Sequence, residues 1–350
     1  MAIHPLARRS LAKLRLPEPI SRYCPGLTER INTNPFAGEF GLYPSPCPDA
    51  HQAAFAAHLT REALQQGRSG TISGKNVLFT AGSVAGIDLL IRAFCEPSVD
   101  RICAPRPTFP CYAAYATAGD IEVVDIPLQG PDFNQLDPAK IADADAKLTF
   151  LCSPNNPIGS SLDPAQIVQV LESSRGLVVI DEAYVDFSTR PSWPGELAHH
   201  PNLVILRTFS KAWGLAGLRV GATLAAPEVL HALRLLQDPY SFHVAAQRAV
   251  AAHIEDHAGV RSMVERVRAE RLRVHAALAE LPVVRRIVPS DTNFLFVELT
   301  RPDGVADLLW GEGILASDSS YQVSGSIRIS IATPEENDRM LRLVRSLPAS

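Results

Sequence analysis

The fold of this chain is limited most by a regular alternation of apolar and helical segments between residues 77 and 206. The apolar segments are short and mostly hydrophobic, and they lie at residues 77–79, 101–104, 121–126, 147–152, 177–180 and 203–206. Helices are predicted between them, at residues 83–94, 109–118, 137–142 and 163–173. Strands that are apolar on both sides are typical of a sheet that is covered on both faces. The alternation therefore predicts an α/β fold with a mostly parallel sheet.

The 350 residues are enough for two lobes. We predict a large α/β domain over residues 45–238, which also contains helices at 51–64 and 227–236. Residues 1–44 are rich in proline and turn residues and predict an N-terminal arm. Residues 239–350 predict a smaller α+β domain that packs with this arm. Its elements are a helical stretch at 242–281 with a break near 257–259, strands at 283–288, 293–298 and 326–331, and helices at 305–311 and 335–347.

The composition argues against several classes of function. A formal net charge of −4 gives no reason to expect a nucleic acid as partner. We expect no membrane span, because the sequence has no run of about 18 apolar residues. The six cysteines form no CxxC pair, which predicts reduced thiols in a cytoplasmic protein and no metal site.

The most informative segment is NLVILRTFSKAWGLAGLRVGAT, which begins at Asn202. Lys211 follows a buried strand, an unusual place for an ordinary surface lysine. A partly desolvated lysine has a lowered pKa and can form a Schiff base. Thr208, Ser210 and Arg219 are suited to bind a phosphate. An aldehyde held by a lysine and a phosphate held separately together suggest pyridoxal phosphate as the cofactor.

Polar residues also follow other predicted strands, where ligands of parallel sheets bind. The turn Gly82-Ser83-Val84 enters a helix and offers backbone N–H groups to an anion, or Ser83 simply caps that helix. Asp181 closes an apolar strand and could pair with a pyridinium nitrogen, or it is a capping or turn aspartate. Tyr184 could reach the cofactor's ring oxygen, or it is a half-buried core residue.

The segment RTFSKAWGLAGLRVG resembles the lysine motif of fold-type-I pyridoxal-phosphate aminotransferases, and most of all their histidinol-phosphate aminotransferase branch. The resemblance extends over residues 32–340, with five separate segments in the family's order. It implies a mostly parallel seven-stranded sheet in the large domain. It also implies that Lys211 holds the cofactor as a Schiff base and that Asp181 and Tyr184 contact its ring.

Four further site residues follow from the resemblance. In SPNNPIG, Asn156 would bind the cofactor's ring oxygen and contact the substrate, although the family commonly has threonine where Ile158 stands. In RPTFPCY, Phe109 would stack on the ring, where the branch commonly has tyrosine; otherwise it is a core aromatic. In GSIRISIA, Arg328 would bind a substrate carboxylate; otherwise it is an exposed arginine of a half-buried strand. In GLYPSP, Tyr43 would reach the cofactor phosphate of a second subunit, which implies a homodimer.

The implied activity is transamination in amino-acid biosynthesis by a ping-pong Schiff-base mechanism. The donor would be histidinol phosphate or a related amino acid, and the acceptor a 2-oxo acid such as 2-oxoglutarate. The branch has an arginine for the substrate phosphate about a dozen residues before Arg328, but Ala316 and Ser317 stand there in this chain. A transaminase for an unphosphorylated, aromatic or specialised-pathway amino acid and a pyridoxal-phosphate decarboxylase therefore remain alternatives.

Overall fold

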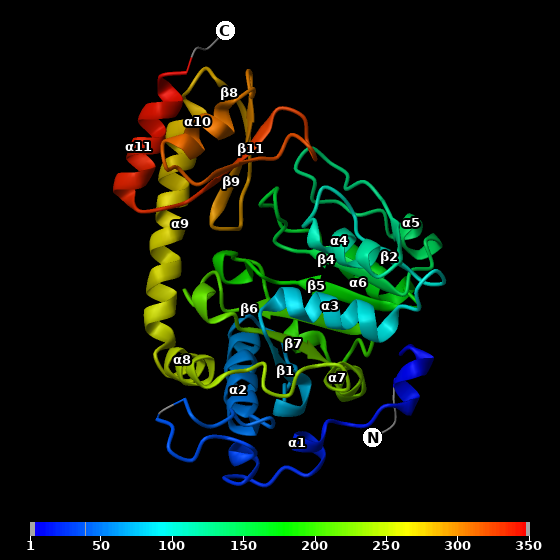
Figure 1. The fold of residues 1–350 in the computed structure, drawn as a ribbon. Helices are drawn as coiled ribbons and strands as arrows, with labels where there is room; N and C mark the ends of the chain where they lie inside the picture. Colours follow the sequence, from blue (N-terminus) through cyan, green and yellow to red (C-terminus); the bar gives the residue numbers. More distant parts are fainter. Residues whose placement is uncertain (1–3, 39, 348–350) are drawn as a thin grey trace.

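The computed structural model describes residues 4–38 and 40–347 and consists of a large and a small lobe, each built on one sheet (Figure 1). The large sheet has seven strands in the order β1-β7-β6-β5-β4-β2-β3. Its strands are β1 (Val77–Thr80), β2 (Arg101–Cys103), β3 (Glu122–Val124), β4 (Leu148–Cys152), β5 (Leu177–Asp181), β6 (Leu203–Thr208) and β7 (Gly221–Ala225). The predicted mostly parallel sheet is confirmed, with one antiparallel strand, β7, between β1 and β6.

Helices cover both faces of the large sheet. The helices of the first face are α2 (Asp49–Gln65), α5 (Pro138–Asp143), α6 (Pro164–Ser173) and α8 (Val244–Glu255). Those of the second face are α3 (Ser83–Phe94), α4 (Cys111–Ala118) and α7 (Pro227–Arg234). Along β5, Val178 and Ile180 belong to the first core, whereas Leu177 and Val179 belong to the second. This alternation explains why the strand is apolar at every position but the last.

The small lobe has an antiparallel sheet in the order β10-β11-β9-β8. Its strands are β8 (Val284–Val288), β9 (Phe294–Leu299), β10 (Ala316–Asp318) and β11 (Ser326–Ser330). The helices α9 (His257–Ala279), α10 (Val305–Gly311) and α11 (Pro334–Arg345) pack on it around a third core. β7 and β10 are not among the predicted strands.

Helix α9 connects the two lobes (Figure 1). Its residues Val260 and Val264 pack in a core of the large sheet, whereas Val274 and Leu278 pack in the core of the small one. The expected break in the helical stretch falls at Asp256, whose side chain accepts a hydrogen bond from the backbone N–H of Gly259 at the start of α9. The domain boundary at residue 239 stays a prediction.

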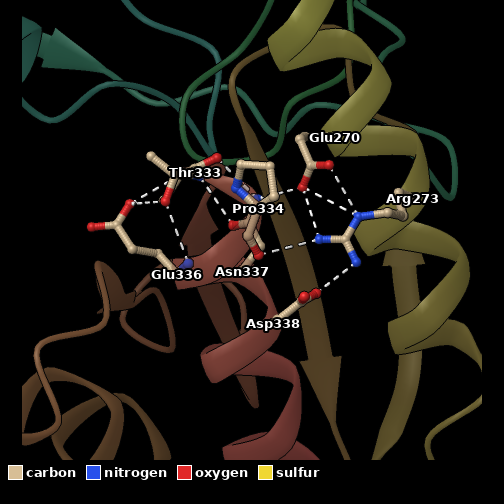
Figure 2. Close-up of polar contacts among 8 residues, drawn as sticks. Glu270, Arg273, Thr333, Pro334, Glu336, Asn337 and Asp338 are labelled. Atoms are coloured by element: carbon tan, nitrogen blue, oxygen red, sulfur yellow. Dashed lines mark hydrogen bonds and ion pairs between the residues drawn. The ribbon is translucent and has the colours of Figure 1, made fainter.

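Polar contacts fix α11 against α9 (Figure 2). Arg273 of α9 bonds to Glu270 in its own helix and to Asp338 of α11, with 2.7 Å between Nη1 and Oδ1 of Asp338. Asn337 donates a hydrogen bond to Glu270 at 2.9 Å, and Thr333 and Glu336 form a capping box at the start of α11. These contacts join α9, which extends to the large lobe, to α11, the helix that follows β11.

In its described residues, 4–38 and 40–44, the N-terminal arm contains only short helices, and it runs beside the large lobe (Figure 1). These are α1 (Glu18–Ser21) and the 3-10 helices η1 (Arg9–Lys13) and η2 (Thr28–Arg30); the other 3-10 helices are η3 (Gly74–Asn76), η4 (Val185–Phe187), η5 (Pro194–Glu196) and η6 (Ala216–Leu218). Within residues 4–38 and 40–347, every helix is too short or too polar to cross a membrane.

Candidate active site

The sheet brings the predicted site residues of the large lobe to one edge. β1, β2, β3, β4, β5 and β6 all point the same way, so their carboxyl ends meet there. Asp181 and Thr208 are the last residues of β5 and β6, and Gly82 lies two residues after β1. β7 runs in the opposite direction and therefore begins at the same edge, which places Arg219 beside them. Residues from motifs that are far apart in the sequence therefore lie close together at this edge of the sheet.

Lys211 lies at this edge and is accessible to solvent. Partial desolvation by the surrounding protein lowers the pKa of its amine, and the nearby charges of Arg328 and Arg219 lower it further, whereas Asp181 opposes them. The amine nitrogen lies 5.6 Å from the centre of the Tyr184 ring. A neutral lysine amine is a nucleophile, so this environment suits Schiff-base chemistry.

Asp181 is 3% exposed, and both of its carboxyl oxygens accept hydrogen bonds. Its Oδ2 accepts one from the Tyr112 hydroxyl at 2.7 Å, and its Oδ1 accepts one from the backbone N–H of Ala183 at 3.1 Å. Burial raises the pKa of Asp181, while these two bonds and the charge of Lys211 lower it. Tyr112 is not among the predicted site residues, because a tyrosine in an apolar helix carries no sequence signal of its partner.

A corner suited to an anion forms where α3 begins. Gly82 is the N-cap residue and no side chain caps the first turn, so the backbone N–H groups of Ser83 and Val84 have no side-chain partner there. Ser83 is thus the first helical residue and not the cap. A Cβ atom at Gly82, whose φ is +84°, would lie 2.7 Å from Nη2 of Arg219. The positive φ favours glycine here, and the missing Cβ leaves room for the guanidinium beside the helix N-terminus.

Arg219 is held in this corner by its own loop. Its Nη1 donates hydrogen bonds to Ser210 Oγ at 3.3 Å and to the carbonyl of Ala216 at 3.0 Å. The residue adopts φ +49°, a left-handed conformation that costs a non-glycine residue about 1–2 kcal/mol. This conformation directs the Arg219 side chain toward the start of α3, where its Nη2 lies next to Gly82. Thr208 completes the corner by accepting a hydrogen bond from the Ser210 backbone at 3.2 Å.

Arg328 of β11 reaches from the small lobe to the same edge. Its Nη1 donates a hydrogen bond to Asn156 Oδ1 at 2.5 Å, and its guanidinium carbon lies 5.2 Å from the Phe294 ring centre. Phe294 also packs edge-on against Tyr184, with 5.2 Å between ring centres. The contact between residues 156 and 328 joins the two lobes directly across the site.

Ser317 occupies an informative position on β10. It pairs with Arg328 across the antiparallel strands, so the two side chains share one face of the sheet. An arginine at position 317 would therefore stand next to Arg328. Ala316 pairs with Ile329 and is buried.

The two remaining predicted residues are Phe109, which contacts a partner of Asp181, and Tyr43, for which the structure shows no contact with the cluster within residues 4–38 and 40–347. Phe109 is half-buried and packs edge-on against Tyr112, with 5.6 Å between ring centres. Tyr43 is 43% exposed in the N-terminal arm and stacks on Tyr240, with 4.3 Å between ring centres. Phe109 thus contacts Tyr112, the hydrogen-bond partner of Asp181, whereas Tyr43 is partly exposed and contacts Tyr240.

The fold and the site together define the class of enzyme to which the chain belongs. A seven-stranded sheet with this strand order, a lysine of lowered pKa, a buried aspartate and an anion-binding corner at the carboxyl edge characterise fold-type-I pyridoxal-phosphate enzymes. The family model for aminotransferases of class I and II matches residues 39–344, and the chain belongs to this family, whose cofactor is pyridoxal phosphate.

Known proteins of the family are similar over most of the chain. A histidinol-phosphate aminotransferase of Parabacteroides distasonis is 35% identical over 319 residues, which are 90% of this chain and 89% of that protein. A solved histidinol-phosphate aminotransferase from Clostridium acetobutylicum aligns with a TM-score of 0.77 and 20% identity, covering 87% of this chain and 90% of that one. An L-threonine-O-3-phosphate decarboxylase from Porphyromonas gingivalis has a TM-score of 0.71 and 22% identity, covering 87% and 92%. The fold is therefore shared by transaminases and decarboxylases.

The residues of the site fit this cofactor. The uncapped first turn of α3, with Arg219 beside it, suits the phosphate. Lys211 offers an amine for the aldehyde. Asp181 offers a buried carboxyl group of the kind that a pyridinium nitrogen can pair with.

Proposed function

We propose that this aminotransferase uses Lys211 as both the anchor of pyridoxal phosphate and the proton-transfer group, with Asp181 at the cofactor's ring nitrogen. The observation that carries the proposal is the environment of Lys211, whose amine has a lowered pKa amid Asp181, Arg219 and Arg328. Pyridoxal phosphate, when bound, supplies an aldehyde that condenses with amines and a ring that accepts electrons from the reacting carbon.

Each chain residue has a defined task in this proposal. Lys211 takes a proton from the substrate carbon and delivers it again as general acid and base. Asp181 stays ionised and keeps a proton on the ring nitrogen. The phosphate is held by Gly82, Ser83, Val84, Thr208, Ser210 and Arg219, and the ring by Phe109, Asn156 and Tyr184. Arg328, with Asn156 as its partner, binds the carboxylate of the 2-oxo acid acceptor, for which 2-oxoglutarate is our candidate.

Histidinol phosphate is the first candidate for the amino donor. Its support is the similarity to several histidinol-phosphate aminotransferases at 32–39% identity. The second candidate is an unphosphorylated amino acid, which Ser317 favours because no guanidinium stands beside Arg328 at that position. An amino-acid decarboxylase of the same fold would release carbon dioxide without consuming 2-oxoglutarate.

The donor can be identified with matched amines. We expect glutamate to form from 2-oxoglutarate when histidinol phosphate is the amino donor. The kcat/KM for histidinol phosphate is then compared with the values for histidinol, which lacks only the phosphate, and for phenylalanine. A strong preference for histidinol phosphate would show that another group binds the phosphate. Turnover with the unphosphorylated amines alone would establish the second candidate, and carbon dioxide release without glutamate would contradict transamination.

Position 317 provides a direct prediction about phosphate recognition. The variant Ser317→Arg places a guanidinium beside Arg328, and a charge-assisted contact contributes about 1.5–3 kcal/mol. We expect kcat/KM for histidinol phosphate to rise about tenfold or more, measured by glutamate formation. Unphosphorylated histidinol serves as the control and should gain nothing. Equal gains for both amines would contradict a phosphate site at this position.

We further propose a homodimer in which Tyr43 contributes to the cofactor phosphate site of the second subunit. The arm that carries Tyr43 exposes several large apolar side chains, which a second copy would cover: Leu27, Ile31, Phe36, Phe40 and Leu42. Phe36 is the most exposed of these side chains, at 94%. Exposed apolar side chains gathered on one arm are typical of an interaction surface.

Complementation between two impaired variants tests this arrangement. Lys211→Ala and Tyr43→Ala each damage every site in their own homodimers. In a mixed dimer, one site combines the intact Lys211 of one chain with the intact Tyr43 of the other. After unfolding and refolding a one-to-one mixture, we therefore expect about a quarter of wild-type activity. A mixture no more active than its separate components would contradict a role for Tyr43 across the dimer.

A cytoplasmic location is part of the proposal. All six cysteines are free, as is usual in reducing compartments. Burial raises the pKa of the Cys95, Cys103 and Cys152 thiols to about 12, so these three are unreactive.

A further inference from the structure

Tyr112 connects three parts of the site. It is completely buried in α4 and stacks on Phe150 of β4, with 4.8 Å between ring centres and an angle of 12°. Its ring edge meets Phe109, and its hydroxyl donates a hydrogen bond to Oδ2 of Asp181 at 2.7 Å. The ring is held between Phe109 and Phe150, and its hydroxyl bonds to the carboxyl group of Asp181 with the Cys152 thiol also nearby.

The hydroxyl is one of two hydrogen-bond donors that the structure shows for the Asp181 carboxyl group. The other is the backbone N–H of Ala183. A buried carboxylate stays ionised only if hydrogen bonds and charges offset its desolvation. Burial and the nearby Asp181 raise the pKa of the Tyr112 phenol, so it remains a protonated donor over the working pH range. The other titratable groups around Asp181 are Lys211, Tyr184, Cys111 and Cys152.

We propose that Tyr112 is a positioning residue that keeps Asp181 ionised and in one orientation, and so sets the protonation of the cofactor's ring nitrogen. The inference rests on the proposed function, which places Asp181 at that nitrogen. Tyr112 does not touch the substrate, and its effect passes through Asp181. Because the same ring supports Phe109, one side chain would fix both the partner of the ring nitrogen and the residue proposed to stack on the ring.

The test uses Tyr112→Phe, which removes one oxygen and keeps the packed ring. In the apoprotein, infrared difference spectroscopy follows the carboxyl C=O band with pH, and Asp181→Asn identifies the band of Asp181. We expect Tyr112→Phe to raise the pKa of Asp181 by about one to two units, because a stabilising bond to the charged form is lost. Tyr115→Phe, the same change on the exposed side of α4, is the matched control and should shift nothing.

The holoenzyme gives a second measurement. With pyridoxal phosphate labelled with nitrogen-15 in its ring, we expect the ring-nitrogen resonance in Tyr112→Phe to change its pH dependence, and the acid limb of kcat/KM to move to higher pH. A carboxyl band and a ring-nitrogen titration identical to those of the wild type would overturn the inference.

Failure of the proposed function would look different. In that case Asp181→Asn itself would leave the ring-nitrogen resonance of the bound cofactor unchanged, whereas the apoprotein titration would still reveal the bond between Tyr112 and Asp181. That result would mean that Asp181 does not pair with the ring nitrogen. The inferred effect of Tyr112 on the protonation of the cofactor would then be wrong as well.

Discussion

The variant Lys211→Ala is expected to lose transamination by about 10³-fold or more. The variant lacks the amine that anchors the cofactor and the group that moves the proton, and general acid–base catalysis alone contributes about 10²–10⁴-fold. Pyridoxal phosphate should still bind, because the variant leaves unchanged the corner around Gly82 and Arg219 that we propose for its phosphate. Glutamate formation measures the loss. Borohydride treatment followed by mass spectrometry should label Lys211 in the wild type and no peptide in the variant.

Two further variants serve as controls, one at position 211 and one at an exposed lysine elsewhere. Lys211→Arg keeps the positive charge without a nucleophilic amine, and we expect it to be as inactive as Lys211→Ala. Lys75→Ala removes an exposed lysine away from the site and should behave as the wild type. Near-normal transamination by Lys211→Ala, or a borohydride label on another lysine of the wild type, would refute the assignment.

The variant Arg207→Met is expected to lower the free energy of unfolding by about 3–5 kcal/mol, because it leaves buried carboxylates without their partner. The Arg207 side chain is 2% exposed, and its Nη2 lies 2.7 Å from Oδ1 of Asp186. Its Nη1 lies 3.4 Å from Oε2 of Glu182, whose side chain is completely buried, and 3.8 Å from Oε2 of Glu62. Denaturant unfolding of the apoprotein measures the change.

The loss of unfolding free energy in Arg207→Met should also depend on pH, and its direction follows from the pKa shifts of Glu182 and Glu62. Burial already raises the pKa of Glu182 and brings that of Glu62 to about 7, while Arg207 lowers both. Without Arg207 the folded-state pKa values rise further above the unfolded ones. Stability is then retained at low pH and lost as pH rises through these values, so the deficit should be larger at pH 8 than at pH 5.

An exposed ion pair supplies the control for this variant. Arg339 lies 3.1 Å from Glu312, and both side chains are about half exposed. Such pairs contribute at most about 1 kcal/mol, so Arg339→Met should change stability little at either pH. An effect of Arg207→Met as small as that of the control would mean that the buried network gives no net stabilisation.

The sequence by itself determined the architecture of the large lobe and the edge of the sheet at which most of the proposed site residues lie. Strands that are apolar on both sides require a sheet covered on both faces, and parallel strands place their carboxyl ends along one edge. Asp181, Thr208 and Lys211 each follow or end such a strand, so their convergence follows from the topology alone. The capping aspartate and proline of α6, Asp163 and Pro164, likewise stand where local chemistry predicts a helix start.

Other features depended on pairings that no local pattern contains. β7 is antiparallel because the 209–220 connection from β6 lacks the crossover helix that a parallel strand needs. Ser317 lies beside Arg328 because of the register between β10 and β11. Arg207 forms ion pairs with three carboxylates that lie on other segments of the chain. The bond from Tyr112 to Asp181 joins residues 69 positions apart. Only the tertiary structure decided these contacts, because hydrogen bonds and ion pairs between distant segments depend on how the layers pack.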